Sequence, residues 1–143
     1  MSEFELFVEG DDLYAAMVRA IDRAEQEVRM ESFIFAADEV GERFVAALSA
    51  RARAGVSVRL HLDQFGAGFP AFRSLEDELQ QAGVAFRWYH PFRWRHPLKY
   101  RRRNHRKLLV VDERSAFLGG FNIRRLNSRA LSGEVRQRDT HVG

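Results

Sequence analysis

The sequence predicts an α/β fold, with a mixed, mostly parallel sheet between helical layers. Short apolar runs of strand length alternate with longer segments whose apolar residues recur at helical spacing. Gly55 and Gly83 follow two of the helical segments, where a left-handed C-terminal residue is common. The 143 residues and 45% hydrophobic content suit one domain with its own core. Strands and helices that alternate in this way favour parallel pairing through right-handed crossovers.

A short strand is expected at residues 4–8, followed by the first helix. Asp11 or Asp12 can cap this helix, because aspartate oxygens accept hydrogen bonds from the free amides of a first turn. The apolar residues of the segment recur at intervals of three and four: Leu13, Met17, Ala20, Ile21 and Ala24. This spacing predicts an amphipathic helix.

The second strand and the second helix are expected at residues 28–35 and 39–54. A strand over 28–35 places Glu31 on the same face as Phe33 and Phe35, because alternate side chains of a strand share a face. The helix has an apolar side formed by Val40, Phe44 and Leu48.

Two further strands, at residues 56–62 and 84–88, flank a third helix. The tetrapeptide Ser74-Leu75-Glu76-Asp77 resembles a capping box, so the sequence predicts the N-terminus of the helix there. Its inward residues are Leu75, Leu79 and Ala82. Beyond residue 104, strands are expected at 105–111, 116–118 and 134–142, with a turn at 112–115 and a polar loop at 124–133.

A long segment, residues 89–104, interrupts the alternation, and loops of this length are commonly functional. Aromatic residues alternate there with Arg and Lys, and no acidic residue lies between Glu78 and Asp112. The resulting positive potential attracts phosphates. Rings among cations suit an anionic membrane interface and also single-stranded nucleic acid, whose bases stack on rings. The residues leave both interpretations open, beside that of a plain solvated loop.

The composition excludes several classes of protein. With no cysteine, the chain has neither a disulfide framework nor a thiolate metal site. No apolar run approaches the ~18 residues that cross a bilayer. The first residues are acidic and mixed, unlike a secretory signal. We expect a cytoplasmic protein which, if its substrate is lipid, is peripheral to the inner membrane.

The stretch NHRKLLVVDERSAFLGGFN, residues 104–122, concentrates the chemistry of the chain. In an extended strand His105 and Lys107 point the same way, about 7 Å apart. An imidazole beside a fixed positive charge suits a nucleophile or a proton donor that works next to an anion, for which phosphate is the obvious candidate.

These residues resemble a known family. The spacing His-x-Lys-x4-Asp-x6-Gly-Gly-x-Asn, which begins at His105, is similar to the motif of the phospholipase D superfamily, and NHRKLLVVD…FLGGFNI resembles its bacterial cardiolipin synthase branch. The resemblance extends to residues 31–35 and 138–142, and it implies an α-β-α sandwich. The family builds one active site from two such motifs, whereas this chain has one. We therefore expect a single domain over residues 1–143, favoured as the N-terminal half of a two-motif enzyme.

The resemblance implies roles for four residues of the site. His105 corresponds to the nucleophile, while Lys107 and Asn122 correspond to residues that bind phosphate oxygens. Asp139 stands where relatives carry the acid that holds the second ring nitrogen of the nucleophile, although relatives usually have Trp at the position of Gln137.

Further residues carry weaker expectations. Gly119 and Gly120 lack side chains, so backbone can approach a ligand there. Arg103 is expected to contact substrate phosphate, and Glu31 either lines the pocket or forms a salt bridge on a strand face. Asp112 is expected to be structural, as the first residue of a tight turn.

No cofactor and no metal are expected. The rival interpretation is a metal site built from the remaining histidines and one acid, His61, Asp63, His90, His96 and His141. These residues offer ligand types without a ligand spacing that is recognisable.

The resemblance implies a two-step transfer. Neutral His105 attacks the phosphorus of a phosphodiester, a second histidine protonates the leaving alcohol, and an acceptor alcohol or water then resolves the phosphohistidine. The expected partners are a phospholipid at a membrane surface and a second motif, from a C-terminal half or a second copy of the chain. Phosphatidylglycerol as acceptor gives cardiolipin, and water gives phospholipase activity. The alternatives are a homodimeric nuclease, which would bind nucleic acid, and a non-catalytic half-domain.

Overall fold

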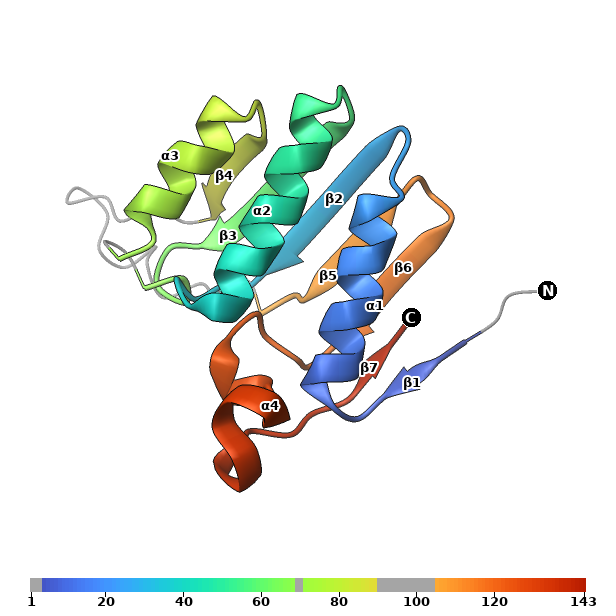
Figure 1. The fold of residues 1–143 in the computed structure, drawn as a ribbon, viewed down its shortest axis with the longest axis vertical. Coiled ribbons are helices and arrows are strands. Elements are labelled where there is room, and N and C mark those ends of the chain that lie inside the picture. The colour runs from blue at the N-terminus through green and yellow to red at the C-terminus, as the bar shows by residue number, and fades with distance from the viewer. Residues whose placement is uncertain (1–3, 69–70, 90–104) are drawn as a thin grey trace.

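The computed structural model describes residues 4–68, 71–89 and 105–143, and its centre is one seven-stranded sheet (Figure 1). The strand order is β1-β7-β6-β5-β2-β3-β4. The strands are β1 (Leu6–Phe7), β2 (Glu27–Ser32), β3 (Ser57–Asp63), β4 (Ala85–Tyr89), β5 (Leu108–Val111), β6 (Ser115–Gly119) and β7 (His141–Val142). The predicted α/β class and the mixed sheet are confirmed. The expectation of mostly parallel pairing holds only for β2, β3 and β4, because the other neighbours are antiparallel.

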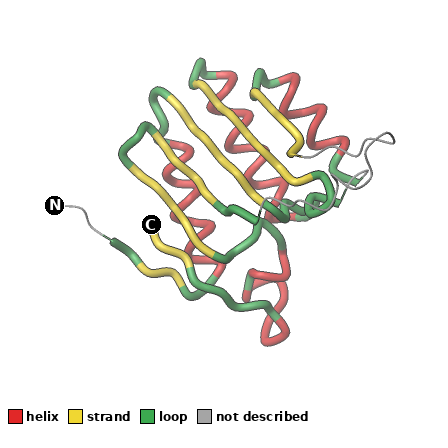
Figure 2. The backbone as a smooth tube through the Cα atoms, turned by 180° about the vertical axis from the view of Figure 1, so that it is seen from behind, coloured by secondary structure: helices red, strands yellow, loops and turns green. Residues whose placement is uncertain are grey.

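Three helices pack on one face of this sheet, α1 (Gly10–Asp22), α2 (Glu39–Arg53) and α3 (Arg73–Gln81). Seen from behind, the strands lie in front and all three helices lie behind them (Figure 2). The short helix α4 (Arg129–Ser132) and the 3-10 turns η2 (Arg125–Asn127) and η3 (Gly133–Val135) lie beyond one end of the sheet. Of the two expected helical layers, the described part of the chain therefore supplies one.

The core lies between the sheet and these helices. Met30 of β2 stands opposite Leu60 of β3 and Leu109 of β5, and all three are buried. Against them pack buried aromatic rings, with Phe35 at right-angle contact to Phe44 and to Phe72. Such edge-to-face contacts add to the stabilisation from burial.

Several elements begin or end at residues other than those expected. β2 ends at Ser32 instead of residue 35, and Ser32 Oγ donates to the carbonyl of Ile34 as the chain turns away. The final expected strand, 134–142, is a strand only at its last two residues. α3 begins at Arg73 without a side-chain cap, so Ser74 lies inside the helix and the predicted capping box is wrong.

The capping of the first two helices differs as well. Asp38 caps α2, accepting hydrogen bonds from the amides of Val40 and Gly41 at 3.1 Å. α1 has Glu9 at its N-cap position and no side-chain cap, so the prediction that Asp11 or Asp12 caps it is wrong. Both aspartates lie in its first turn, where negative charge suits the helix dipole.

Candidate active site

The residues of the His105 motif gather at one end of the sheet. β5 runs antiparallel to β2, so the residues just before β5 lie where β2 ends. Because β6 is antiparallel to β5, and β7 to β6, Gly119 at the end of β6 and Asp139 just before β7 reach the same end. The carboxyl ends of β3 and β4 share it, since β3 pairs in parallel with β2 and β4 pairs in parallel with β3. Ligands commonly bind at this edge of an α/β sheet.

His105 is exposed, and its ring stacks on that of Phe33 with the centroids 4.1 Å apart and the planes 26° apart. β5 begins at Leu108, so His105 and Lys107 lie on the approach to the strand and not within it. Lys107 Nζ turns back to donate to the carbonyl of His105 at 2.8 Å, and it lies 5.8 Å from the centre of the Phe33 ring. The sequence reasoning gave Phe33 no role in the site; the available signal was its place in the segment 31–35 that resembles the family.

The ammonium group of Lys107 is partly desolvated. Burial lowers its pKa, the charge of Asp139 opposes that shift, and Arg124 adds to it. Asp139 is therefore close enough to Lys107 to interact with it electrostatically. Within the described residues no hydrogen bond joins Asp139 to His105; the Oδ1 atom of Asp139 accepts from the amide of Thr140 at 2.8 Å.

The two glycines of the motif are required by the approach of β7. A Cβ atom on Gly120 would overlap the carboxylate of Asp139, and one on Gly119 would overlap the backbone of Thr140 and His141. The sequence predicts open space for a ligand at these glycines. The structure instead places β7 and Asp139 in that space. The absence of side chains on Gly119 and Gly120 therefore allows Asp139 to reach the site.

Asn122 ties the site to the loop after β2. Its Oδ1 atom accepts from the amide of Ile34 at 3.2 Å, and its carbonyl accepts from the hydroxyl of Tyr14. Burial raises the pKa of Tyr14, so this hydroxyl stays protonated as a donor. The Nδ2 group of Asn122 has no partner within the described ranges, which leaves it able to donate to a ligand.

Asp112 lies at the opposite end of β5. Its carboxylate accepts from the amides of Glu25, Gln26 and Glu27, each at 2.8 Å, and these bonds hold its pKa below the ordinary value. The residue has a positive φ of 52°, as a tight turn between β5 and β6 requires. Its contacts join this turn to the start of β2.

Glu31 and Arg103 complete the predicted set. Glu31 lies in the middle of the sheet, opposite His61 on β3 and Leu108 on β5, and it faces away from the helices. Leu108 directly follows Lys107, so Glu31 lies on the face without helices near the site end of β2, and its role in the pocket stays a prediction. Arg103 lies outside the described residues, as does the rest of the basic and aromatic segment from residue 90 to residue 104.

The histidines considered as metal ligands are separated. His61 lies on the face of the sheet without helices, while His141 is buried on the helical side, opposite Phe7 and Gly119. His90 and His96 fall outside the described residues, and among those described no cluster of three His, Asp or Glu could hold a metal ion. Burial lowers the pKa of His141 to about 4, Asp139 opposes the shift and Lys107 adds to it.

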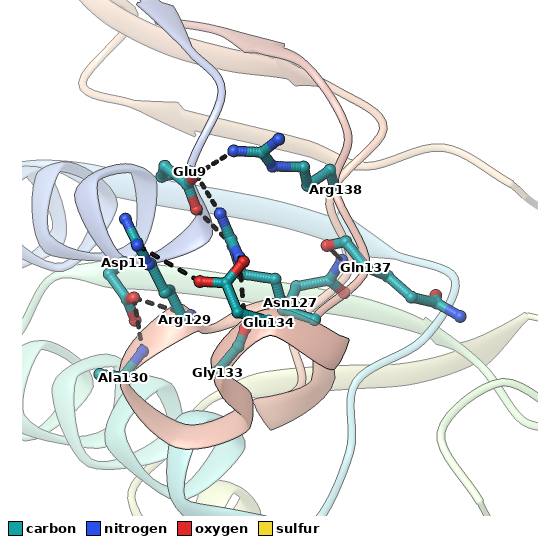
Figure 3. Close-up of polar contacts among 10 residues, drawn as sticks. Glu9, Asp11, Asn127, Arg129, Ala130, Gly133, Glu134, Gln137 and Arg138 are labelled. Carbon is teal, nitrogen blue, oxygen red and sulfur yellow. Dashed lines mark hydrogen bonds and ion pairs between the residues drawn. The ribbon is translucent and has the colours of Figure 1, made fainter.

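A polar clamp holds the segment that leads into Asp139 (Figure 3). Glu9 accepts two hydrogen bonds from the buried Arg136, at 2.7 and 2.8 Å, and one from Arg138 at 3.0 Å. These arginines lower the pKa of Glu9 to about 2. Asp11, predicted to cap α1, instead accepts from the amides of Arg129 and Ala130 at the start of α4. In the sequence, the acidic residues at positions 9, 11 and 12 were the signal that could have indicated this clamp.

Comparison with known proteins gives a consistent assignment. The family model described as "Cardiolipin synthase, PLD-like domain" matches residues 17–135. Over 123 residues, 85% of this chain, the identity is 36% to the cardiolipin synthase of Clostridium perfringens and 39% to cardiolipin synthase B of Salmonella typhi. The chain covers only 25% and 30% of those two proteins.

Solved structures share the fold. Nuc from Salmonella typhimurium, a phospholipase D family member, has a TM-score of 0.70 at 22% identity, covering 98% of this chain and 82% of that one. The phosphatidylserine synthase of Haemophilus influenzae also has a TM-score of 0.70, at 12% identity, covering 97% of this chain and 32% of that one.

Proposed function

Since the chain belongs to the cardiolipin synthase, PLD-like domain family of the phospholipase D superfamily, we propose that it forms one half of a phosphatidyltransferase that works through a phosphohistidine. The observation that carries this proposal is that exposed His105, Lys107 and Asp139 lie at the same end of the sheet, with the carboxylate of Asp139 against Gly120 of the motif. An imidazole, a fixed cation and an acid are the groups that a covalent transfer of a phosphoryl group requires.

In the first step, neutral His105 attacks phosphorus, and the bond from phosphorus to the leaving oxygen breaks as that oxygen takes a proton from a second histidine. Lys107 and the Nδ2 group of Asn122 stabilise the non-bridging oxygens, where negative charge develops. In the second step the oxygen of an acceptor alcohol attacks phosphorus, the bond from phosphorus to the ring nitrogen of His105 breaks, and the second histidine takes the proton of the alcohol. Stacking on Phe33 limits the orientations of the attacking ring.

Asp139 is proposed to accept a hydrogen bond from the second ring nitrogen of His105 once substrate is bound. A carboxylate in that position fixes the tautomer and stabilises the positive imidazole of the intermediate. The approach of β7 over Gly120 supports this role, because it carries the carboxylate into the site. Hydrogen bonds of catalytic groups often tighten only in the substrate complex.

The second histidine comes from elsewhere, because the chain carries one motif. The chain spans about a quarter to a third of the length of the curated relatives it matches, which favours the remainder of a longer protein over a second copy. We propose that the donor is a phospholipid, with phosphatidylglycerol as acceptor, met at the cytoplasmic side of the inner membrane. No metal or other cofactor takes part. No helix of the described residues is long and apolar enough to cross a membrane.

The alternative is a homodimeric nuclease, which the likeness of fold to Nuc over 82% of that chain keeps open. Turnover of phosphatidylglycerol and of single-stranded DNA, each with a chelator present, separates the two functions. The assay is run on the chain alone over a range of concentrations, and after addition of the C-terminal part of a longer relative. Specific activity that rises with the concentration of the chain alone indicates a dimer, whereas activity only after the addition indicates a half-enzyme.

His105→Ala is expected to abolish turnover in whichever assembly is active, since no other group replaces the nucleophile. Mass spectrometry of trapped, acid-sensitive phosphate on His105 is the direct check. Arg43→Ala is the control, because it removes an exposed side chain of α2 that contributes nothing to the candidate site, and it should leave turnover near that of the wild type. Near-normal turnover of His105→Ala would refute the proposal.

A further inference from the structure

The face of the sheet that α1, α2 and α3 leave uncovered is chemically divided. No helix in the described parts of the chain lies over it (Figure 2). Residues opposite one another on neighbouring strands share a face, and one such row crosses the whole sheet: Leu6, Val142, Leu118, Leu108, Glu31, His61 and Arg87. The half of this open face on β1, β7, β6 and β5 is apolar, and the half on β2, β3 and β4 is charged.

The apolar half is exposed and adjoins the candidate site. Leu6, Leu118 and Val142 are 63%, 61% and 38% exposed. Leu118 directly precedes the two glycines of the motif, and Leu108 directly follows Lys107. A continuous apolar surface of this kind on a protein domain marks a contact with another apolar surface.

The charged half has an excess of unpaired cations. An open depression there is lined by Arg29, Glu31, Arg59, His61 and Arg87, among others. Arg29 forms an ion pair with Glu27 at 2.6 Å. Arg59 and Arg87 are both exposed, and no carboxylate in the described ranges pairs with either one. This half of the face therefore favours a negatively charged partner.

We propose that the open face is the surface by which the domain docks onto an anionic phospholipid bilayer. The inference rests on the proposed function for its choice of lipid, and it assigns the contact to the sheet instead of the segment 89–104. Apolar side chains beside arginines match the boundary between acyl chains and anionic headgroups. A second copy of the chain fits less well, because it would bring the same basic excess toward itself.

Sedimentation with vesicles tests the assignment, using phosphatidylglycerol mixed with phosphatidylcholine and, as a second arm, phosphatidylcholine alone. Arg59→Ser with Arg87→Ser is expected to weaken binding to the anionic vesicles roughly thirtyfold, about fivefold for each arginine. The matched control is Arg43→Ser with Arg53→Ser, which removes the same charge from exposed positions of α2. The fold-loss of affinity for the control is expected to be less than half of that for Arg59→Ser with Arg87→Ser.

The apolar half is tested by Leu118→Ser, with Val135→Ser as the control because Val135 is 79% exposed in the turn η3. Leu118→Ser is expected to weaken binding several-fold and the control to leave it unchanged. Since the chain has no cysteine, Leu118→Cys can also carry an environment-sensitive dye as its only thiol. Its emission is expected to shift to the blue with anionic vesicles, while the same dye on Gln81→Cys, at the end of α3, shows no shift.

Four outcomes would decide against the surface: face variants that bind like their controls, equal binding to both kinds of vesicle, equal dye shifts at positions 81 and 118, or self-association that Leu118→Ser abolishes. The last would assign the face to contact between copies. Vesicle binding is measured without turnover, so its failure is separate from that of the chemistry. Face-dependent binding by a protein that stays inactive on phosphatidylglycerol, even after the C-terminal part of a longer relative is added, would support the surface and refute the transferase.

Discussion

Two aspartates at opposite ends of the sheet, Asp112 after β5 and Asp139 before β7, are used in different ways. At the turn end, Asp112 accepts three backbone hydrogen bonds, which engage both of its carboxylate oxygens. At the site end, Asp139 is exposed and accepts one hydrogen bond, from the residue that follows it. Groups whose hydrogen bonds are completed by the fold stabilise it, while groups left incomplete at a sheet edge remain available to a ligand. The comparison predicts opposite consequences for the same substitution.

Asp139→Asn is the largest expected effect. The amide keeps the size of the side chain but removes the negative charge near Lys107 and the preferred acceptor for His105. In a serine protease, the same substitution leaves the catalytic histidine in the wrong tautomer. By analogy, turnover in the active assembly is expected to fall by up to about 10⁴-fold. The melting temperature should stay close to that of the wild type, because the exposed carboxylate makes a single bond. A loss of stability with little loss of rate would break the comparison.

Asp112→Asn is expected to do the reverse. An amide presents one acceptor oxygen where the carboxylate presents two to the amides of Glu25, Gln26 and Glu27, so thermal denaturation should show a lower midpoint. The lowered pKa of Asp112 adds a check by pH. Its stabilisation is present above the ordinary value of 3.8 and is lost as pH falls through the folded-state pKa. The variant should lose less stability than the wild type over that acid range, and its turnover should remain within a few-fold.

The sequence alone predicted much of the fold. Helical spacing placed α1 and α2 within one or two residues at most ends, because their apolar stripes are regular. The failures have local causes: Ser74 looks like a cap, but the helix begins one residue earlier at Arg73. Strand propensity cannot reveal that the segment before β7 is held instead by Glu9, which lies 127 residues away from Arg136.

The motif indicated which residues to consider for the candidate site, but it did not indicate their surroundings. His105, Lys107 and Asp139 are brought to one end of the sheet, as the resemblance implies. The ring stacking of Phe33 depends on a loop that begins where β2 ends early. The role of Gly120 depends on how closely β7 approaches, and spacing along one strand carries no information about either contact.

The smallest expected effect concerns His141, the buried group behind the motif. Both of its ring nitrogens lack a hydrogen-bond partner among the described residues, and burial lowers its pKa from 6.5 to about 4. Between these values the unfolded chain binds a proton at His141 that the folded chain does not, so the free energy of unfolding decreases as pH falls from about 6.5 toward 4. His141→Leu removes this titration and should flatten that part of the curve of unfolding free energy against pH, measured by chemical denaturation at several pH values.

Asp139→Asn is the informative second variant, because Asp139 raises the pKa of His141. Without that carboxylate the pKa of His141 falls further, and the loss of stability should extend to lower pH. Equal slopes for His141→Leu and the wild type would mean that folding leaves the pKa of His141 unchanged, so that burial does not keep this imidazole neutral.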